Sequence, residues 1–240
     1  MVMTKKKPRS AAKAPLREPV SLPRVVAAAM ALADAEGVAA LTMRGVAAAL
    51  GVQAMSLYNH VANKEAILDR MVDAVFASVE VRTDLPWKEA LAARGRAIRG
   101  ALLKHPWAIG MLESRRTPGA VTLRHHDAWI GVLRRGGFSA KLVAHALAVV
   151  DAYVYGFALQ EVQLPLSPKE DIPNLAQEIL ASMPAAELPN LAWFTVEHVM
   201  KPGYAFADEF EYGLELVLDG LEMRASAEKE GAKGRKGKSQ

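Results

Sequence analysis

The side chains between residues 53 and 64 have the types and the spacing that suit contact with DNA. Gln53 and Asn59 carry amides that can pair with the adenine edge in the major groove, and Ala54 and Met55 can touch a thymine methyl group. Tyr58 and His60 can reach backbone phosphates. We therefore expect one reading surface, made of Gln53, Ala54, Met55, Ser56, Tyr58, Asn59 and His60.

Polar and basic residues flank this surface on both sides. Lys64 opens the next predicted helix, whose N-terminal amides also attract phosphate. Thr42 is expected to cap the preceding helix and Arg44 lies in its first turn. Both are expected to contact the flanking DNA backbone, which positions a protein without reading bases. The alternative is an ordinary turn between two helices of a bundle.

Two short helices must hold these residues, over Met43–Leu50 and Gln53–His60. The apolar side chains of this stretch are spaced to face one core, and Ala47 is small where the helices cross. Gly51 stands where the chain turns sharply, and glycine accepts a positive φ at little cost. Together these features predict a helix-turn-helix at about residues 42–61. The residues facing the core are Val46, Leu50, Val52 and Leu57.

The rest of the chain reads as helical, so the expected fold class is all-α. Ser21 is a candidate N-cap, Pro23 lies in the first turn and Gly37 is expected to end this first helix in the left-handed αL conformation. A helix over Lys64–Val79 is expected to join the DNA-binding part of the chain, the head (residues 21–82), to the remaining helical part, the body (residues 83–224). Further helices are predicted near 87–104, 106–114, 118–136, 139–162, 171–182, 187–200 and 205–224.

Charge and composition divide the chain into four parts. Residues 1–20 are a flexible basic arm, 21–82 a DNA-binding head, 83–224 an effector-binding and dimerisation body, and 225–240 a disordered basic tail. The net charge is +4 over residues 1–82, −4 over 83–223 and +4 over 224–240. This distribution favours a nucleic-acid-facing head on an acidic body, although basic tails can also serve solubility alone.

Catalytic and metal chemistry find little support in the sequence. The chain has no cysteine, which excludes thiolate metal sites, disulfides and cysteine nucleophiles. No pair among its histidines has helical metal-ligand spacing, so we expect no metal and read His125 and His126 as one pocket or interface residue beside one solvated residue. No phosphate loop or serine-nucleophile motif is present. We expect the protein not to be an enzyme.

One apolar stretch could be mistaken for a membrane span. Residues 142–159 are apolar nearly all round but contain His145 and Asp151. Such a helix is more often buried between protein surfaces than in lipid. We expect a cytoplasmic protein with no membrane partner.

The head resembles that of the tetracycline-repressor (TetR) family of bacterial regulators. The resemblance is carried by Leu41-Thr42, Leu50-Gly51-Val52, Leu57-Tyr58-Asn59-His60 and Asn63-Lys64. It continues into the body at residues 99–108, 136–139, 153–159 and 210–222, and covers roughly residues 21–224. It implies an all-helical homodimer whose effector, bound in the body, changes the spacing of two reading heads.

The resemblance also implies an effector pocket, and two positions of this pocket differ from those of the tetracycline-binding members. Tetracycline-binding members hold a drug–magnesium chelate partly through a histidine, and that position here is Glu113. The acidic position that accompanies this histidine in those members corresponds here to Gln160, which is followed by Glu161. We therefore expect no cofactor and no magnesium-chelated effector, but a cationic or hydroxylated hydrophobic compound. The expected pocket residues are Glu80, Arg94, Ile98, Trp107, Met111, Glu113, Arg116, Thr117, His126, Trp129, Tyr153 and Phe157.

The sequence thus favours a homodimeric, ligand-responsive repressor that leaves a palindromic operator when an effector binds. Apolar residues on helices 139–162 and 205–224 predict a four-helix interface with the symmetry mate. The dimer seams are expected at Leu142, Ala146, Val149, Val150, Tyr153 and Phe157, and at Phe206, Phe210, Leu214, Val217 and Leu221. A helical scaffold protein with a non-functional helix-turn-helix is the alternative, and an enzyme comes third.

Overall fold

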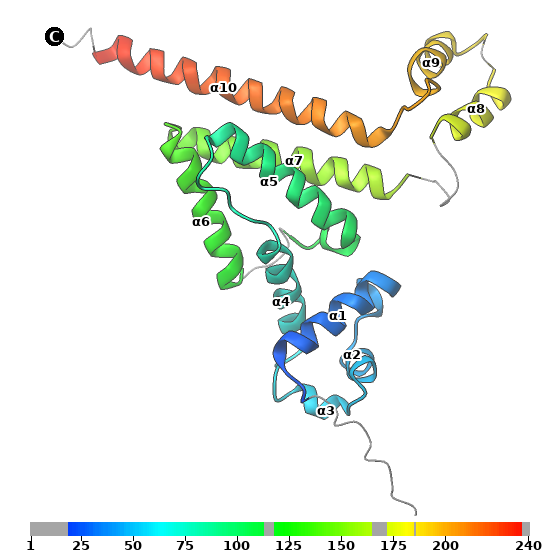
Figure 1. The fold of residues 1–240 in the computed structure, drawn as a ribbon, viewed down its shortest axis with the longest axis vertical. Helices are drawn as coiled ribbons and strands as arrows, with labels where there is room; N and C mark the ends of the chain where they lie inside the picture. The colour runs from blue at the N-terminus through cyan, green and yellow to red at the C-terminus, as the bar shows by residue number, and fades with distance from the viewer. Residues whose placement is uncertain (1–18, 113–117, 165–171, 185, 237–240) are drawn as a thin grey trace, which may run out of the picture.

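The computed structural model describes residues 19–112, 118–164, 172–184 and 186–236. These residues form helices and contain no strand. The smaller unit in Figure 1 is built from four helices around a 3-10 turn at Val38–Ala40. They are α1 (Leu22–Glu36), α2 (Met43–Leu50), α3 (Ala54–Leu57) and α4 (Lys64–Ala77).

The larger unit, the body, lies at the far end of α4. Figure 1 shows α7 and α10 side by side, with α5 and α6 beneath them and with α8 and α9 beyond the end of α7. Short 3-10 turns at Pro106–Ala108 and Phe206–Asp208 and a π-helical turn at Thr195–Val199 complete the body. Its helices are α5 (Trp87–Lys104), α6 (Ala120–Arg135), α7 (Ala140–Val162), α8 (Ile172–Ser182), α9 (Pro189–Phe194) and α10 (Glu209–Lys236).

Local sequence signals explain where several helices begin. The hydroxyl oxygen of Thr42 accepts a hydrogen bond from the backbone N–H of Gly45, and Asn63 and Ser139 cap α4 and α7 in the same way. Ser21 occupies the expected N-cap position of α1, but its side chain makes no capping bond. Gly37 has a positive φ of 81° with an extended ψ of 158°, so it is not in the expected αL conformation.

Helix α4 belongs to two hydrophobic cores. Its first half contributes Ile67, Leu68 and Met71 to the core of the head, around α1, α2 and α3. Its second half contributes Val72 and Phe76 to the core of the body. A rigid helix packed into both cores is a mechanical link between them, because tilting it must disturb the packing at each end.

Some predicted helix bounds were wrong. α3 spans only Ala54–Leu57, and hydrogen-bonded turns carry the chain from residue 58 to 61. Where a helix was expected at 106–114, the described residues 106–112 contain a 3-10 turn over Pro106–Ala108 and no α-helix, and residues 113 and 114 lie outside the described part. The basic tail is helical as far as Lys236, because α10 continues twelve residues beyond the predicted end at 224.

Helix α7 is the one described helix that is long and apolar enough, by length and composition, to cross a membrane. Here it packs against α5 and α10 of the body. Most residues expected at the dimer seams face this core instead: Leu142, Ala146, Val150, Phe157, Phe210, Leu214 and Leu221 are buried within one chain. The exposed apolar stripes lie beside them, at Val149 and Leu159 on α7 and at Tyr212, Leu216 and Met223 on α10.

Candidate DNA interface and effector site

A tight turn places α3 against α2. Gly51 has φ 68° and ψ 33°, a left-handed conformation that glycine adopts without strain. The backbone N–H of Val52 bonds to the Ala47 carbonyl across this turn, which closes the C-terminus of α2. Leu57 is completely buried and Val61 nearly so. These two anchors fix the rotation of α3 and therefore decide which side chains point outward.

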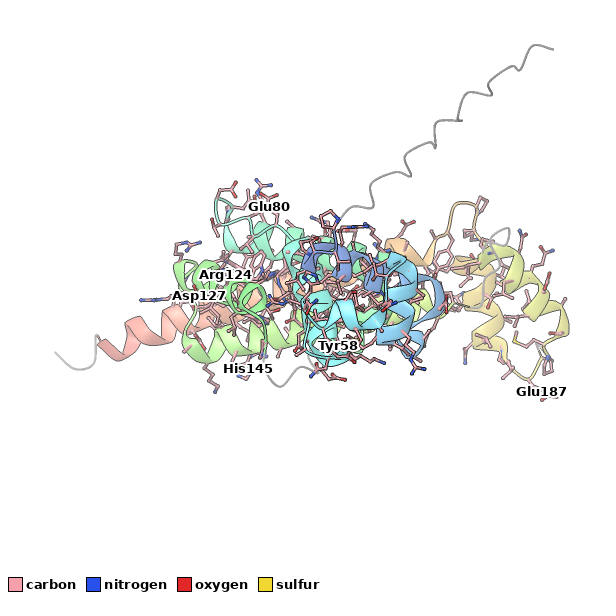
Figure 2. The ribbon with its side chains drawn as sticks, turned by 90° about the horizontal axis from the view of Figure 1, so that it is seen from below. Tyr58, Glu80, Arg124, Asp127, His145 and Glu187 are labelled. Carbon is pink, nitrogen blue, oxygen red and sulfur yellow. The ribbon has the colours of Figure 1, made fainter. Side chains whose placement is uncertain are left out.

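The outward side chains are those expected to read DNA. Met55 is 73% exposed, and Gln53, Tyr58, Asn59 and His60 are exposed as well. Ala54 and Ser56 are half-buried at the base of the same surface. Figure 2 views the molecule from below, onto the head, and shows Tyr58 there. Met55 on α3 and Tyr58 directly after it expose apolar surface to water, and contact with another molecule would remove this unfavourable hydration.

The flanking groups border this surface. Arg44 is exposed on the first turn of α2, and Thr42 is exposed at its N-cap. Lys64 is half-buried at the start of α4, where Asn63 caps the helix. The N-terminus of α4 therefore offers backbone N–H groups and a lysine at one edge of the reading surface, an arrangement that favours phosphate.

Three side chains connect the head directly to the body. Asp34 of α1 accepts a hydrogen bond from the indole N–H of Trp107 at 2.6 Å, and its carboxylate lies 2.8 Å from Nδ1 of His105. His105 is the C-cap of α5, and Trp107 lies in the 3-10 turn that follows. Trp107, expected in the effector pocket, therefore lies at the junction between the two units, where Met111 also contacts both cores.

The centre of the body is a buried polar cluster within aromatic packing. Arg94 of α5 is only 1% exposed, and its Nη1 lies 2.5 Å from the Asp151 carboxylate of α7. Its guanidinium carbon is 5.5 Å from the ring centre of Trp129, a distance that permits a cation–π contact. Ile98 and Trp129 are equally buried. In this conformation these three predicted pocket residues offer a ligand almost no surface.

His125 joins this cluster from α6. The indole N–H of Trp129 donates to Nε2 of His125 at 2.6 Å. Burial, then the Arg94 cation and His126, lower the pKa of His125 to about 4, so the ring is neutral at pH 7. A neutral imidazole that accepts at Nε2 carries its proton on Nδ1.

A hollow of about 460 Å³ lies on the surface beside this cluster. It is lined by His126 of α6 and by Leu147, Ala148, Asp151, Ala152 and Tyr155 of α7. Asp151 forms part of its wall and at the same time holds Arg94 behind it. The hollow therefore lies one side chain away from the buried cluster.

The other expected pocket residues lie elsewhere. Tyr153 donates to the Phe210 carbonyl at 2.9 Å, and Phe157 stacks on Phe206, so both attach α7 to the α10 region. Glu80 is exposed at the outer edge of the body (Figure 2). Glu161, which borders the position expected for a metal-binding acid, pairs with Arg99 at 2.6 Å. Glu113, Arg116 and Thr117 lie outside the described residues.

Comparison with known proteins agrees with this architecture. Residues 25–71 match the family described as bacterial regulatory proteins, tetR family, and residues 83–225 match the tetracyclin repressor-like C-terminal domain. The second match alone covers more than half of the chain. The chain belongs to the TetR family.

Individual TetR-family relatives match over most of their length. HTH-type transcriptional repressor DrrR1 of Streptomyces coeruleorubidus is 32% identical over 85% of this chain and 78% of its own. Tetracycline repressor protein class A from transposon 1721 of Escherichia coli is 31% identical over 83% of this chain and 89% of its own. The Streptomyces coelicolor protein ActR, solved in complex with actinorhodin, is 28% identical, covers 87% and 99% of the two chains, and gives a TM-score of 0.70.

Sequence reasoning missed two residues that connect the parts of this TetR-family chain. Asp34 and Asp73 each lie on an otherwise apolar helix face and bond to a residue outside their own helix. Asp73 is 5% exposed in the middle of α4, where carboxylates are rarely buried without a partner. A lone acid at a core position of the linking helix was the signal available in the sequence.

Proposed function

We propose that this TetR-family chain is a homodimeric repressor, which binds a palindromic operator through two reading surfaces and leaves it when a small molecule binds in the body. The observation that carries this proposal is α4, which begins at the DNA surface with Lys64 and ends in the core of the body with Phe76. An effector that changes how α4 packs in the body changes the tilt of the head. Such a ligand shifts the equilibrium only by its differential affinity for the two arrangements.

A second copy of the chain is proposed to cover the exposed stripes of α7 and α10. The stripe on α10 consists of Tyr212, Leu216 and Met223, and Leu216 is 57% exposed. A groove of about 830 Å³ between α7 and α10, lined in part by His145, Val149 and Leu221, would accept side chains of the partner. Because the two-fold axis would relate the heads, the operator should hold two half-sites about one helical turn apart or a modest multiple of it.

We further propose that the protein acts in the cytoplasm, where its DNA is, and that it has no catalytic activity of its own. The effector site is proposed to include the hollow beside His126 and the cluster of Arg94, Trp129 and His125. The contacts of Thr42, Arg44, Gln53, Asn59 and Lys64 with DNA also belong to this proposal.

The deciding experiment is a fluorescence-anisotropy titration of the full chain against DNA from upstream of its own gene. We expect a complex that forms at a defined near-palindromic site, weakens steeply with salt and survives competition by random DNA. The matched control is a double variant, Gln53→Ala with Asn59→Ala, which leaves the buried anchors Leu57 and Val61 in place. Its specific complex should weaken toward the level of random DNA.

The alternative is a helical scaffold protein with a non-functional helix-turn-helix. It predicts no site-specific complex at any salt concentration, and equal binding by the wild type and the double variant. A complex with the expected specificity that no small molecule dissociates would instead support a regulator without an effector.

A further inference from the structure

Two buried N–H groups in the body have no acceptor among the residues that the structure describes. They are Nε of Arg94 and Nδ1 of His125. Arg94 is 1% exposed and His125 is 5% exposed, so bulk water does not reach either atom. Buried donors almost always have a partner in native proteins, and an exception calls for a physical explanation.

Both groups can only donate in this setting. The Nε of an arginine carries a hydrogen and has no lone pair to accept with. On His125, the bond from Trp129 occupies Nε2, which leaves the ring proton on Nδ1. The two groups share one cluster, because Arg94 lies over the Trp129 ring and Trp129 bonds to His125. Both unpaired donors therefore belong to the same buried cluster, and each calls for an oxygen acceptor.

The charge balance of the cluster selects the kind of acceptor. The Arg94 cation is already paired with the Asp151 carboxylate, and His125 is neutral. An anionic ligand would place an unbalanced charge in the core, and a cationic ligand would meet Arg94 with no acid to spare. A neutral carbonyl oxygen satisfies the donors and leaves the charges balanced.

The neighbouring side chains indicate what kind of molecule carries this carbonyl oxygen. The ring of Phe76 lies edge-on to His125 at a centroid distance of 4.9 Å and is 5.6 Å from His126. With Trp129, these rings form aromatic walls, which pack well against a flat apolar molecule. The surface hollow beside His126 and Asp151 lies directly outside the cluster and offers a way in.

We propose that Arg94 Nε and His125 Nδ1 are the polar anchor of the effector site, and that the effector is a neutral, flat apolar compound with a carbonyl oxygen. This inference rests on the proposed function, because it assigns the ligand class of that effector site. It replaces the cationic or hydroxylated hydrophobic compound expected from the sequence. Pairing these donors supplies binding free energy, and it moves the head only as far as the ligand binds the two arrangements of α4 with different affinity.

The test compares 9-fluorenone with fluorene, which have the same three-ring frame and differ by the carbonyl group. Equilibrium dialysis against the full chain should show 9-fluorenone bound about 10-fold more tightly, because fluorene leaves the donors unpaired. The planar cation proflavine should bind more weakly than 9-fluorenone. Equal affinity of the two matched probes, failure of both to bind, or tighter binding of proflavine would overturn the inference.

The variant His125→Met isolates the anchor. The methionine sulfur is a weak acceptor for the Trp129 N–H and carries no donor, so the donor at Nδ1 is lost. We expect the preference for 9-fluorenone to fall to about threefold or less. The control is His198→Met, which makes the same change outside the cluster, at an imidazole whose Nε2 lies 2.9 Å from a Glu209 carboxylate oxygen. It should keep the preference, and a preference that His125→Met also keeps would contradict the assignment.

Operator affinity is measured separately, with the same probes, by anisotropy. If 9-fluorenone shows the preference and also dissociates the operator complex, the inference and the proposed function both stand. If the preference appears but operator affinity does not change, the anchor stands and the effector-release function fails. If the operator is bound specifically but the matched probes bind equally, the regulator stands and the anchor fails.

Discussion

The carboxylate of Asp73 on α4 accepts two hydrogen bonds from Thr122 on α6, one from its backbone N–H at 3.1 Å and one from its hydroxyl at 2.8 Å. Thr122 is the third residue of α6, and the N-cap of that helix is Gly119, which has no side chain to cap with. Asp73 therefore caps α6 from another helix. A β-carbon on Gly119 would overlap the Asp73 carboxylate.

This cap connects the linking helix to the helix that bears the effector cluster. α4 carries the head, and α6 carries His125, His126 and Trp129. A carboxylate near a helix N-terminus also interacts favourably with the helix dipole. Movement of α6 away from α4 must therefore break two hydrogen bonds and separate a favourable electrostatic pair.

The first prediction is that Gly119→Ala and Asp73→Ala are strongly non-additive. Alone, Asp73→Ala should lower the free energy of unfolding by about 1–2 kcal/mol through loss of a cap. Alone, Gly119→Ala should lower it by about 1–3 kcal/mol through steric overlap. Together they should cost less than the sum, because the alanine at 73 makes room for the new methyl group. Urea denaturation of the four proteins gives the coupling.

A matched control lies in the same helix. Gly131 of α6 has space for a β-carbon, whose nearest neighbour would be the flexible end of Arg135. Gly131→Ala should leave stability unchanged or raise it by up to about 1 kcal/mol, as expected for glycine in a helix interior. Destabilisation by Gly131→Ala equal to that by Gly119→Ala would show that the cap is not the cause.

The second prediction concerns the phosphate contact of Lys64. Lys64→Ala should weaken binding to specific and random DNA alike and reduce the slope of log affinity against log salt by about one. Lys201→Ala is the control, because Lys201 is paired with Glu197 in the turn after α9 rather than in the head. An unchanged salt slope in Lys64→Ala would remove this residue from the interface.

The head was predictable because its signals are local. Thr42, Gly51 and the apolar spacing of Val46 and Leu57 each act within a few residues, and the structure confirms the cap, the turn and the buried face. The extent of α3 was overestimated because the sequence pattern continues beyond Leu57, while the chain there closes into tighter turns.

The body was less predictable because its organisation depends on long-range contacts. Aromatic and apolar residues at helical spacing can face a cavity, the core of one chain or a partner, and periodicity does not distinguish these cases. Trp107 illustrates this point: only the position of Asp34, 73 residues away, places it at the junction. The cap from Asp73 and the pairing of Arg94 with Asp151 likewise connect residues far apart in sequence.

The third prediction is that the exposed stripes of α7 and α10 form the dimer. Leu216→Glu should give a monomer at micromolar concentration, measured by light scattering, because a charge at the centre of an apolar interface is costly to bury. Leu103→Glu, at an exposed leucine near the end of α5, should remain dimeric. A wild-type protein that is already monomeric, or a Leu216→Glu protein that still dimerises, would contradict this assignment.

The fourth prediction concerns pH and follows from His125. Its pKa is lowered from 6.5 to about 4 in the folded protein, chiefly by burial. Between these two values the unfolded chain binds a proton that the folded chain does not, so the free energy of unfolding must fall as the pH decreases from 7 toward 4. The full shift corresponds to a loss of about 3 kcal/mol, since one pKa unit is worth about 1.4 kcal/mol.

Urea denaturation of the wild type and of His125→Gln at several pH values between 4 and 7.5 measures this effect. Carboxylates such as Glu211, whose pKa is lowered by its bond to Arg96, also lose stabilising charge in acid, but they do so equally in both proteins. The difference between the two proteins therefore isolates the imidazole: wild type should lose relative stability as the pH falls below 6.5. A difference that stays constant across this range would mean that the pKa of His125 is the same in the folded and unfolded chains, and it would contradict the burial of a neutral ring on which the assignment of Nδ1 as an unpaired donor depends.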